Sequence, residues 1–330
     1  MTAVVCAHDA SDSAVSDALE RALASQRPGE NAVVELSRRF FDYSSSYTIE
    51  TLDARLADGT VLELVLKDLS PESLLPDARS RPAFAGDPER EIAAYTGFLS
   101  WGPPGPPALF GTSVDFGRGR YWLFLERVDG LQLQHVGELS VWTAAAEWLG
   151  RFHAAFSSDE TTVASSPVRD DTYYRYWLDR ACAFAAGGRP HTDARRLQRL
   201  ADRFDVVTRR LAAMPATVVH GDFCAANIVV AQARDSVRIC PVDWERSAVG
   251  PAMVDLAALT AGSWTPGQQE TLVAAYESAS GRPVDRTDLA LCRLQLALQW
   301  AGWSESWVPP LEYARDWLGL ALNIAEEVGL

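Results

Sequence analysis

The segment that decides how this chain is interpreted reads Thr217-Val-Val-His220-Gly221-Asp222-Phe-Cys-Ala-Ala-Asn227-Ile-Val-Val-Ala and continues as Val237-Arg-Ile-Cys-Pro-Val-Asp243-Trp-Glu245. The pattern predicts two short antiparallel strands, with Asn227 opening the first and Asp243 closing the second. Because the start of one strand lies beside the end of its partner, their side-chain oxygens should meet at one end of the hairpin. A carboxylate beside a carboxamide is a donor set that suits Mg²⁺.

Asp222 belongs to the same constellation, since it lies on the loop that leads into this hairpin. That place suits a carboxylate that accepts a proton from a hydroxyl. A single aspartate in a loop is usually a turn or cap residue. The full pattern, His-Gly-Asp-x₄-Asn followed by Asp243 and then by Gly250-Pro251-x₃-Asp255, is too long and too regularly spaced for that explanation.

The composition limits the classes of protein that remain. The chain has 330 residues, and acidic residues outnumber basic ones by 44 to 30, which gives a net charge of −14 and argues against a nucleic-acid partner. The five cysteines form no Cys-x-x-Cys pair, so neither a disulfide framework nor a zinc site is expected. No apolar run is long enough for a membrane helix and no signal peptide is apparent. We expect a cytoplasmic protein without a membrane partner.

Lysine usage singles out one position, because Lys67 is the only lysine among the 30 basic residues. An ammonium is a compact point charge, and a site that fits it need not fit a guanidinium. The surrounding pattern predicts strands over 32–41, 47–56 and 60–68, with Asp58-Gly59 as a hairpin turn between the last two. Alternation places Lys67 on one face with Val65, and Leu62, Leu64 and Leu66 on the other.

The remaining pattern divides the chain near residue 130. Residues 1–129 form a sheet-rich lobe, and residues 130–330 form a mainly helical lobe. The expected elements are helices over 11–24, 88–99, 140–156, 193–211, 266–279, 285–303 and 310–328 and strands over 108–114 and 120–127. His153 falls on the core-facing stripe of its helix, which favours a buried, hydrogen-bonded histidine over a catalytic one.

On these residues the chain resembles the aminoglycoside phosphotransferase and choline kinase superfamily over about residues 31–330. The resemblance implies an α+β, bilobal protein-kinase-like fold with a small antiparallel-sheet N-lobe and a large, mainly helical C-lobe. It implies that Asp222 is the catalytic aspartate and that Asn227 and Asp243 bind Mg²⁺. His220 would then support the loop, and Asp255 would be a buried carboxylate that accepts hydrogen bonds from it.

The same resemblance implies a nucleotide site in the N-lobe. Lys67 matches the third-strand lysine that contacts the nucleotide phosphates, and Glu91 matches its ion-pair partner. Val65 would lie against the adenine, and the main chain from Glu126 to Val128 would bind the base. The nucleotide would be ATP, with GTP not excluded.

Two departures from the pattern of protein kinases matter. The loop between the first two strands holds Ser44, Ser45 and Ser46 in place of glycines, so these serines would bring N–H groups and hydroxyls to phosphate. After Asp243 the chain has Trp-Glu in place of Phe-Gly, and no long activation segment precedes Asp255. This second departure favours a small-molecule acceptor over a protein.

The acceptor is where alternatives stay open. The acidic surplus favours a cationic acceptor, and Glu245 is the acid expected to meet it. An acceptor wall would include aromatic residues, although the same spacing is typical of a core stripe: Tyr173, Trp177, Trp300, Trp303 and Trp307. The leading hypothesis is an aminoglycoside or amino-sugar kinase, connected with antibiotic resistance or natural-product tailoring. The alternatives are a choline- or homoserine-type metabolite kinase, a catalytically silent kinase-like binding module and a protein kinase. The oligomeric state is left open.

Overall fold

The computed structural model describes residues 10–26, 31–41, 46–75, 78, 86–157, 166–187, 191–233, 236–303 and 315–330. Ser44, Ser45 and Trp307 lie outside the described residues. The chain divides into two compact units. The first comprises Met1–Trp101 and Gly105–Gly130, and the second comprises Gly102–Pro104 and Leu131–Leu330.

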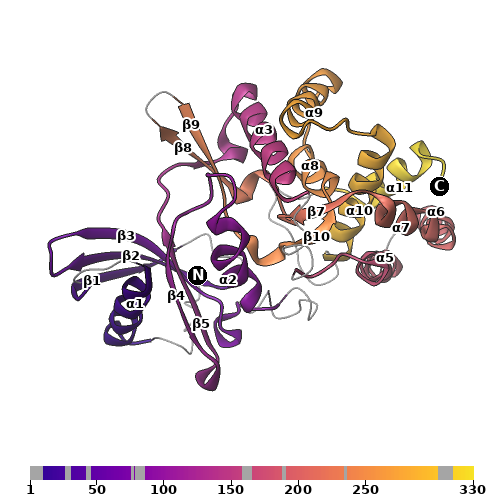
Figure 1. The fold of residues 1–330 in the computed structure, drawn as a ribbon. Helices are drawn as coiled ribbons and strands as arrows, with labels where there is room; N and C mark the ends of the chain where they lie inside the picture. The colour runs from indigo at the N-terminus through magenta and orange to yellow at the C-terminus, as the bar shows by residue number, and fades with distance from the viewer. Residues whose placement is uncertain are drawn as a thin grey trace. The chain divides into compact units, whose positions relative to one another are not determined.

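The first unit is built on a five-stranded antiparallel sheet with the order β1-β2-β3-β5-β4 (Figure 1). Its strands are β1 (Val33–Phe40), β2 (Thr48–Leu56), β3 (Val61–Asp68), β4 (Leu109–Asp115) and β5 (Arg120–Glu126), and its helices are α1 (Asp12–Gln26) and α2 (Glu89–Thr96). Short 3₁₀ turns are η1 (Pro71–Ser73), η4 (Phe98–Ser100) and η5 (Phe116–Arg118). The predicted helix over 88–99 ends early because the chain changes direction at Gly97.

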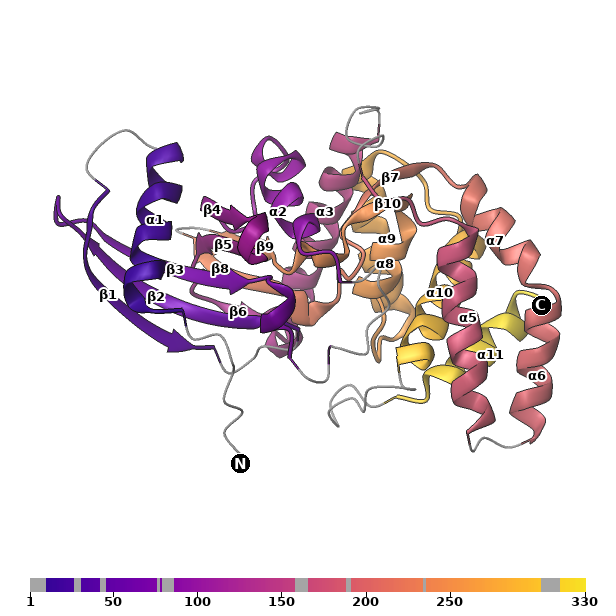
Figure 2. The ribbon, with the colours of Figure 1, turned by 90° about the horizontal axis from the view of Figure 1, so that it is seen from below.

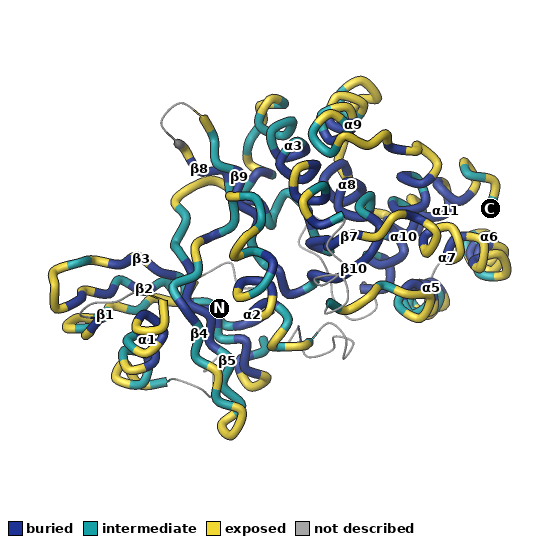
Figure 3. Tube along the Cα trace, in the orientation of Figure 1, coloured by how far each residue is buried: buried dark blue, intermediate teal, exposed yellow. Residues whose placement is uncertain are grey.

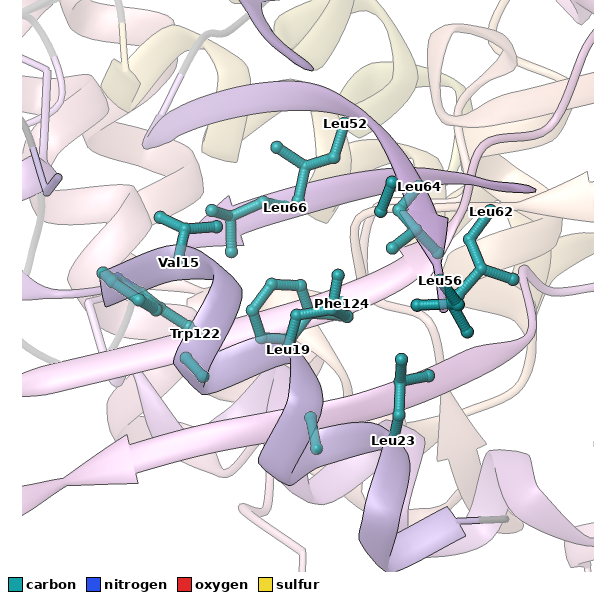
Figure 4. Packing of buried hydrophobic residues seen from close by; sticks show 13 residues of the cluster. Val15, Leu19, Leu23, Leu52, Leu56, Leu62, Leu64, Leu66, Trp122 and Phe124 are labelled. Carbon is teal, nitrogen blue, oxygen red and sulfur yellow. The ribbon is translucent and has the colours of Figure 1, made fainter. Parts of the chain in front are cut away.

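The core of this unit lies between α1 and one face of the sheet, as Figure 4 shows. Leu62, Leu64 and Leu66 alternate along β3 and all point into this core, which confirms the face predicted from the sequence. The helix contributes residues one turn apart, among them Val15 and Leu19. Each buried side chain of this size contributes about 1.5–3 kcal/mol. The polar side chains of β3 are therefore left to the opposite face.

The second unit is mainly helical. Its helices are α3 (Leu139–Phe156), α5 (Asp171–Ala186), α6 (His191–Asp202), α7 (Phe204–Ala213), α8 (Met253–Leu259), α9 (Pro266–Ser280), α10 (Arg286–Trp303) and α11 (Trp317–Glu327). Its strands are β6 (Leu131–Gln132), β7 (Ala216–Val219), β8 (Ile228–Ala233), β9 (Ser236–Pro241) and β10 (Ala248–Pro251), with 3₁₀ turns η6 (Leu133–His135), η7 (Ala225–Asn227) and η8 (Trp244–Arg246). The strands form two small sheets, β6-β8-β9 and β10-β7.

Helix α10 is the central helix of this unit, since it packs on α5, α8 and α11 (Figure 2). Figure 3 shows α8 and α10 as largely buried, whereas α6 and α9 carry much exposed surface. Among the described helices, none is both long enough and apolar enough to cross a membrane.

The predicted helix over 193–211 is also wrong in its extent. The pattern over 193–211 predicts a single helix, but the structure has two, α6 and α7, which are separated at Arg203. Arg203 leaves helical geometry with φ −114° and ψ 4°. Its N–H donates to the carbonyl oxygen of Leu200, three residues earlier, where an α-helix would use the residue four earlier. Leu197 and Phe204 are buried on both sides of the break. The apolar period runs through the break, which is why the sequence did not indicate it.

Candidate active site

Asp255 accepts hydrogen bonds from the backbone at the start of the loop 220–227. It lies in the first turn of α8 and is 0 % exposed. Its Oδ2 accepts the N–H of His220 at 2.7 Å, and its Oδ1 accepts the N–H of Gly221 at 2.9 Å. His153 Nε2 lies 3.2 Å from Oδ2, and its Nδ1 lies 2.9 Å from the Tyr276 hydroxyl. The prediction of a buried, hydrogen-bonded His153 is confirmed.

These contacts keep Asp255 ionised. Burial raises the pKa of Asp255, but the hydrogen bond from His153 and the nearby positive charges outweigh it, so the pKa lies below its usual range. A buried carboxylate whose oxygens all accept hydrogen bonds is a structural group. It therefore fixes the backbone of the loop.

The imidazole of His220 ties the loop to the segment after β9. The N–H of Asp222 lies 3.2 Å from Nδ1, and Nε2 lies 2.9 Å from the carbonyl oxygen of Val242. Nδ1 must therefore accept and Nε2 must donate, which requires the neutral ring. Burial lowers the pKa of His220, which agrees with this state.

Gly221 allows the loop to turn at this point. Its φ of +84° is a conformation that a side chain disfavours, and a Cβ there would collide with the Arg246 backbone and the Arg169 guanidinium. Nη2 of Arg169 donates to the Gly221 carbonyl at 2.8 Å, and its guanidinium lies over the Tyr173 ring at 4.9 Å. Sequence reasoning missed Arg169, because this contact joins residues 52 positions apart.

Asn227 and Asp243 flank the end of the β8–β9 hairpin. Ile228 pairs with Pro241, and the N–H of Val242 donates to the Asn227 carbonyl at 2.9 Å. The elements differ in detail from the prediction, since Asn227 ends η7 and Asp243 follows the last residue of β9 by two positions. The two residues are nevertheless brought to the same end of the hairpin, because the backbone bond from Val242 joins their neighbourhoods.

The side chains there suit a magnesium ion. Asn227 donates through Nδ2 to the Asp222 carbonyl at 3.1 Å, which leaves its amide oxygen as a ligand atom. Asp243 has φ 69° and ψ 61°, and among the described residues it is the one non-glycine with positive φ. No group of three or more His, Cys, Asp or Glu side chains that could hold a metal occurs in the described part of the chain. Mg²⁺ takes few protein ligands and keeps waters and phosphates, so one carboxylate and one amide fit it.

Asp222 differs from its neighbours because its carboxylate is open. Its oxygens accept no hydrogen bond from the described residues, and its side chain is 14 % exposed. Oδ2 lies 3.9 Å from Nη1 of Arg246, which is an ion pair but too long for a hydrogen bond. Arg246, another residue that the sequence analysis missed, lies with its guanidinium over the Trp303 ring at 4.8 Å. The sequence signal that could have found it is a basic residue a few positions after the strand that ends at Pro241.

In the first unit, Lys67 forms a short ion pair with Glu91 of α2. Nζ lies 2.6 Å from Oε2, and the two side chains are only 8 % and 1 % exposed. Lys67 lies in β3 between Ile49 of β2 and Leu123 of β5, and Val65, two residues earlier on the same face, is half-buried. The side chain of the one lysine in the chain is therefore buried and paired, and it does not lie on the surface.

The proposed nucleotide hinge has one free backbone donor. The N–H of Glu126 donates to Ala108 at 2.9 Å, and that of Arg127 donates to Glu63 at 3.2 Å. The N–H of Val128 donates to no described residue. Ser46 is buried, and its carbonyl accepts the N–H of Leu75 at 2.9 Å.

Some of the aromatic residues suggested for the acceptor wall lie in the core. Trp177 is 1 % exposed and packs on Trp303 with ring centroids 5.0 Å apart. Tyr173 and Trp300 are half-buried, and the Tyr173 hydroxyl donates to Gln299 at 2.9 Å. The pair Trp177 and Trp303 fits the core stripe. Glu245 is also buried, at 5 % exposed.

Comparison with known proteins gives one family and one fold. A model of the phosphotransferase enzyme family matches residues 47–292. No curated protein matches the sequence. Three similar solved structures are a microcompartment-associated aminopropanol kinase (17 % identity, TM-score 0.58, 89 % of this chain and 90 % of that one), the GDP complex of aminoglycoside 2'-phosphotransferase-IIIa (13 %, 0.57, 93 % and 96 %) and the choline kinase LicA from Streptococcus pneumoniae (13 %, 0.55, 90 % and 93 %). The predicted bilobal, protein-kinase-like fold is confirmed.

Proposed function

This chain belongs to the phosphotransferase enzyme family and is a small-molecule kinase, and on that premise we propose that it transfers the terminal phosphoryl group of ATP to a hydroxyl of its acceptor. The observation that carries the proposal is the carboxylate of Asp222, which is open while Asp255 holds the backbone of His220 and Gly221 just before it. A group held in place without satisfied oxygens is positioned to receive a hydroxyl.

Asp222 acts on the acceptor. Its carboxylate accepts the hydrogen bond of the hydroxyl, directs the oxygen at the terminal phosphorus and takes the proton as the new O–P bond forms. The bond between that phosphorus and the bridging oxygen breaks, and ADP leaves. Phosphoryl transfer depends mainly on positioning and on neutralisation of charge. The bonds from His220 and Asp255 to the loop support this role because they fix the backbone that carries Asp222.

The first unit binds the nucleotide in this proposal. Lys67, oriented by Glu91, neutralises phosphate oxygens. Val65 packs on the base, and the backbone at Glu126 and Val128 bonds to it, with the free N–H of Val128 as the support. Ser44, Ser45 and Ser46 contact the phosphates. GTP is the second nucleotide to be tested.

Asn227 and Asp243 are the proposed ligands of Mg²⁺, which when bound would neutralise charge on the phosphates. The amide of Asn227 is fixed by its bond to the Asp222 carbonyl. The left-handed backbone at Asp243 is a strained conformation next to the loop, as is common at functional sites.

For the acceptor we propose an aminoglycoside or another compound that bears an amino sugar. The net charge of −14 supports this class, because it raises the local concentration of cations. The wall of the acceptor site would include the half-buried Tyr173 and Trp300 and the ring of Trp303 beneath Arg246, with Trp177 packed behind Trp303 and Glu245 close behind. A choline- or homoserine-type acceptor is the alternative, and the fold is shared with a choline kinase and an aminopropanol kinase.

The test is a coupled ADP-release screen of the purified chain with Mg-ATP or Mg-GTP and a panel of acceptors. The panel contains aminoglycosides, macrolides, choline, homoserine and nucleosides, and mass spectrometry detects the added phosphate. We expect transfer to at least one small hydroxyl compound. Nucleotide binding without transfer to any of them would favour a silent binding module, and labelled phosphate on added proteins would favour a protein kinase.

A further inference from the structure

The side chain of Arg246 is partly exposed, and it donates no hydrogen bond to any residue that the structure describes. Its side chain is 15 % exposed, and the carboxylate of Asp222 is 3.9 Å away. None of its nitrogen atoms is among the buried, unpartnered atoms of the described residues, so the N–H groups that bond no described residue reach solvent. The N–H groups of Arg246 are therefore available to a ligand at the position where Asp222 would meet the acceptor.

Trp303 limits where these donors can point. The guanidinium carbon lies 4.8 Å from the centroid of the Trp303 ring, and that ring packs on Trp177 with centroids 5.0 Å apart. Stacking uses the face of a guanidinium and leaves the N–H groups free along its edge. Because Trp177 and Trp303 are buried, Arg246 has a fixed surface behind it.

Arg246 stays protonated. Burial lowers the pKa of Arg246, but the negative charges of Asp222, Glu245 and other acidic groups outweigh it, and the pKa is raised. A protonated amine placed against this guanidinium would be repelled, whereas an oxygen with a lone pair would be bound.

We propose that Arg246 binds the acceptor by donating a hydrogen bond to an oxygen on the carbon next to the reacting hydroxyl. The inference rests on the proposed function, in which the reacting hydroxyl donates to Asp222. That hydroxyl must keep a lone pair directed at the phosphorus, so Arg246 serves a second oxygen. The acceptor is then a 1,2-diol or a compound with an equivalent neighbouring oxygen. In an amino sugar that fits this site, the reacting hydroxyl is one whose neighbouring carbon carries oxygen, and the amine lies further away.

The test compares acceptors that differ only at the neighbouring carbon. 1,2-Propanediol is paired with 1-amino-2-propanol, and ethane-1,2-diol is paired with ethanolamine. kcat/KM is measured for wild type, for Arg246→Met, which keeps the length but removes charge and donors, and for Arg246→Lys, which keeps the charge. Arg180→Met is the matched control, because Arg180 also lies over an aromatic ring, that of Tyr176 at 5.8 Å, but donates to the Gly302 carbonyl.

Wild type and Arg180→Met should prefer the oxygen-bearing member of each pair by about tenfold or more. Arg246→Met should bring that ratio close to one with its affinity for Mg-ATP unchanged in calorimetry. Arg246→Lys should still reject the amine but use the diol less well than wild type. A preference of wild type for the amine, or an unchanged ratio in Arg246→Met, would overturn the proposal.

The product gives a second readout that needs no variant. Mass spectrometry of any acceptor phosphorylated in the broad panel should place the phosphate on an oxygen whose neighbouring carbon also carries oxygen. A phosphate beside a carbon that bears an amine or only hydrogen contradicts the role of Arg246 but leaves the kinase assignment standing. Absence of transfer to every acceptor, with Mg-ATP bound, removes the proposed function and the role of Arg246 with it.

Discussion

Asp222 and Asp255 lie in the same unit and belong to the same sequence motif, but their carboxylates have opposite surroundings. Asp255 is 0 % exposed and accepts two backbone N–H groups and His153. Asp222 is 14 % exposed, and among the described residues its carboxylate forms an ion pair with Arg246 alone, at 3.9 Å. The difference teaches that the bonds a carboxylate already makes, more than its place in a motif, separate a structural group from one free to react.

The Lys67–Glu91 pair adds a third case. It is closed and buried like the contacts of Asp255, with 2.6 Å between Nζ and Oε2, and yet its proposed role is to bind nucleotide. A buried ion pair of this kind contributes little net stability, because desolvation offsets its attraction. We therefore propose that the pair is there to bind nucleotide and not to stabilise the sheet.

Asp222→Asn tests the open carboxylate and should have the largest effect. Removal of the proton acceptor should lower kcat by roughly 10²–10⁴-fold. Because Asp222 makes no hydrogen bond through its carboxylate, the unfolding midpoint should stay close to that of wild type. Turnover by coupled ADP release and thermal unfolding measure the two effects. Equal kcat in variant and wild type would remove Asp222 from the chemistry.

Asp255→Asn tests the closed carboxylate and should give the reverse pattern. Asparagine has one acceptor oxygen where aspartate has two. One of the donors that bond Asp255 would therefore face an NH₂ group in the buried site. We expect the free energy of unfolding to fall by about 3 kcal/mol, measured by urea denaturation. If Asp222→Asn lost as much stability as Asp255→Asn, the distinction between the two aspartates would not hold.

Lys67→Met separates binding from stability in the first unit. Loss of the ammonium should raise the KM for ATP by about tenfold or more, because an unpaired phosphate charge remains. The variant also leaves Glu91 as a buried single charge, which should destabilise the unit. Adding Glu91→Gln should recover stability without recovering the KM for ATP. Recovery of both in the double variant would show that Lys67 acts only through the fold.

The neutral state of His220 predicts a dependence of stability on pH. Burial lowers its pKa in the folded chain, so the unfolded chain takes up the proton first as the pH falls. The contribution is complete above about pH 6.5 and is lost as the pH falls below it, at up to about 1.4 kcal/mol per pH unit. The pKa of Asp255 is also lowered, but its effect begins only below about pH 4.

His220→Gln is the control for this dependence, because glutamine does not titrate. Urea denaturation between pH 7 and 5 should show a shallower slope for the variant than for wild type. Parallel slopes would assign the titration to other groups.

Much of the fold could be predicted from the sequence, because the first unit is built from local patterns. Alternation along β3 and the turn at Asp58-Gly59 fix the strands without long-range information. Antiparallel pairing of two neighbouring strands also predicts that Asn227 and Asp243 lie at the same end of the hairpin. The resemblance supplied Glu91 as the partner of Lys67, which no pattern in the sequence indicated.

The parts that could not be predicted depend on contacts between distant segments. Arg169 reaches Gly221, and Arg246 lies over Trp303, and neither contact follows from spacing. The break at Arg203 was hidden, because the apolar period continues through it. The left-handed backbone of Asp243 is also set by its surroundings, since aspartate adopts many turn conformations.

The most direct test of the central claim is an experimental structure of the chain with a magnesium-bound, non-hydrolysable ATP analogue and an acceptor that turns over. We predict that the reacting hydroxyl lies within about 2.6–3.2 Å of a carboxylate oxygen of Asp222. A hydroxyl bound elsewhere, with Asp222 bonded only to Arg246, would contradict the account.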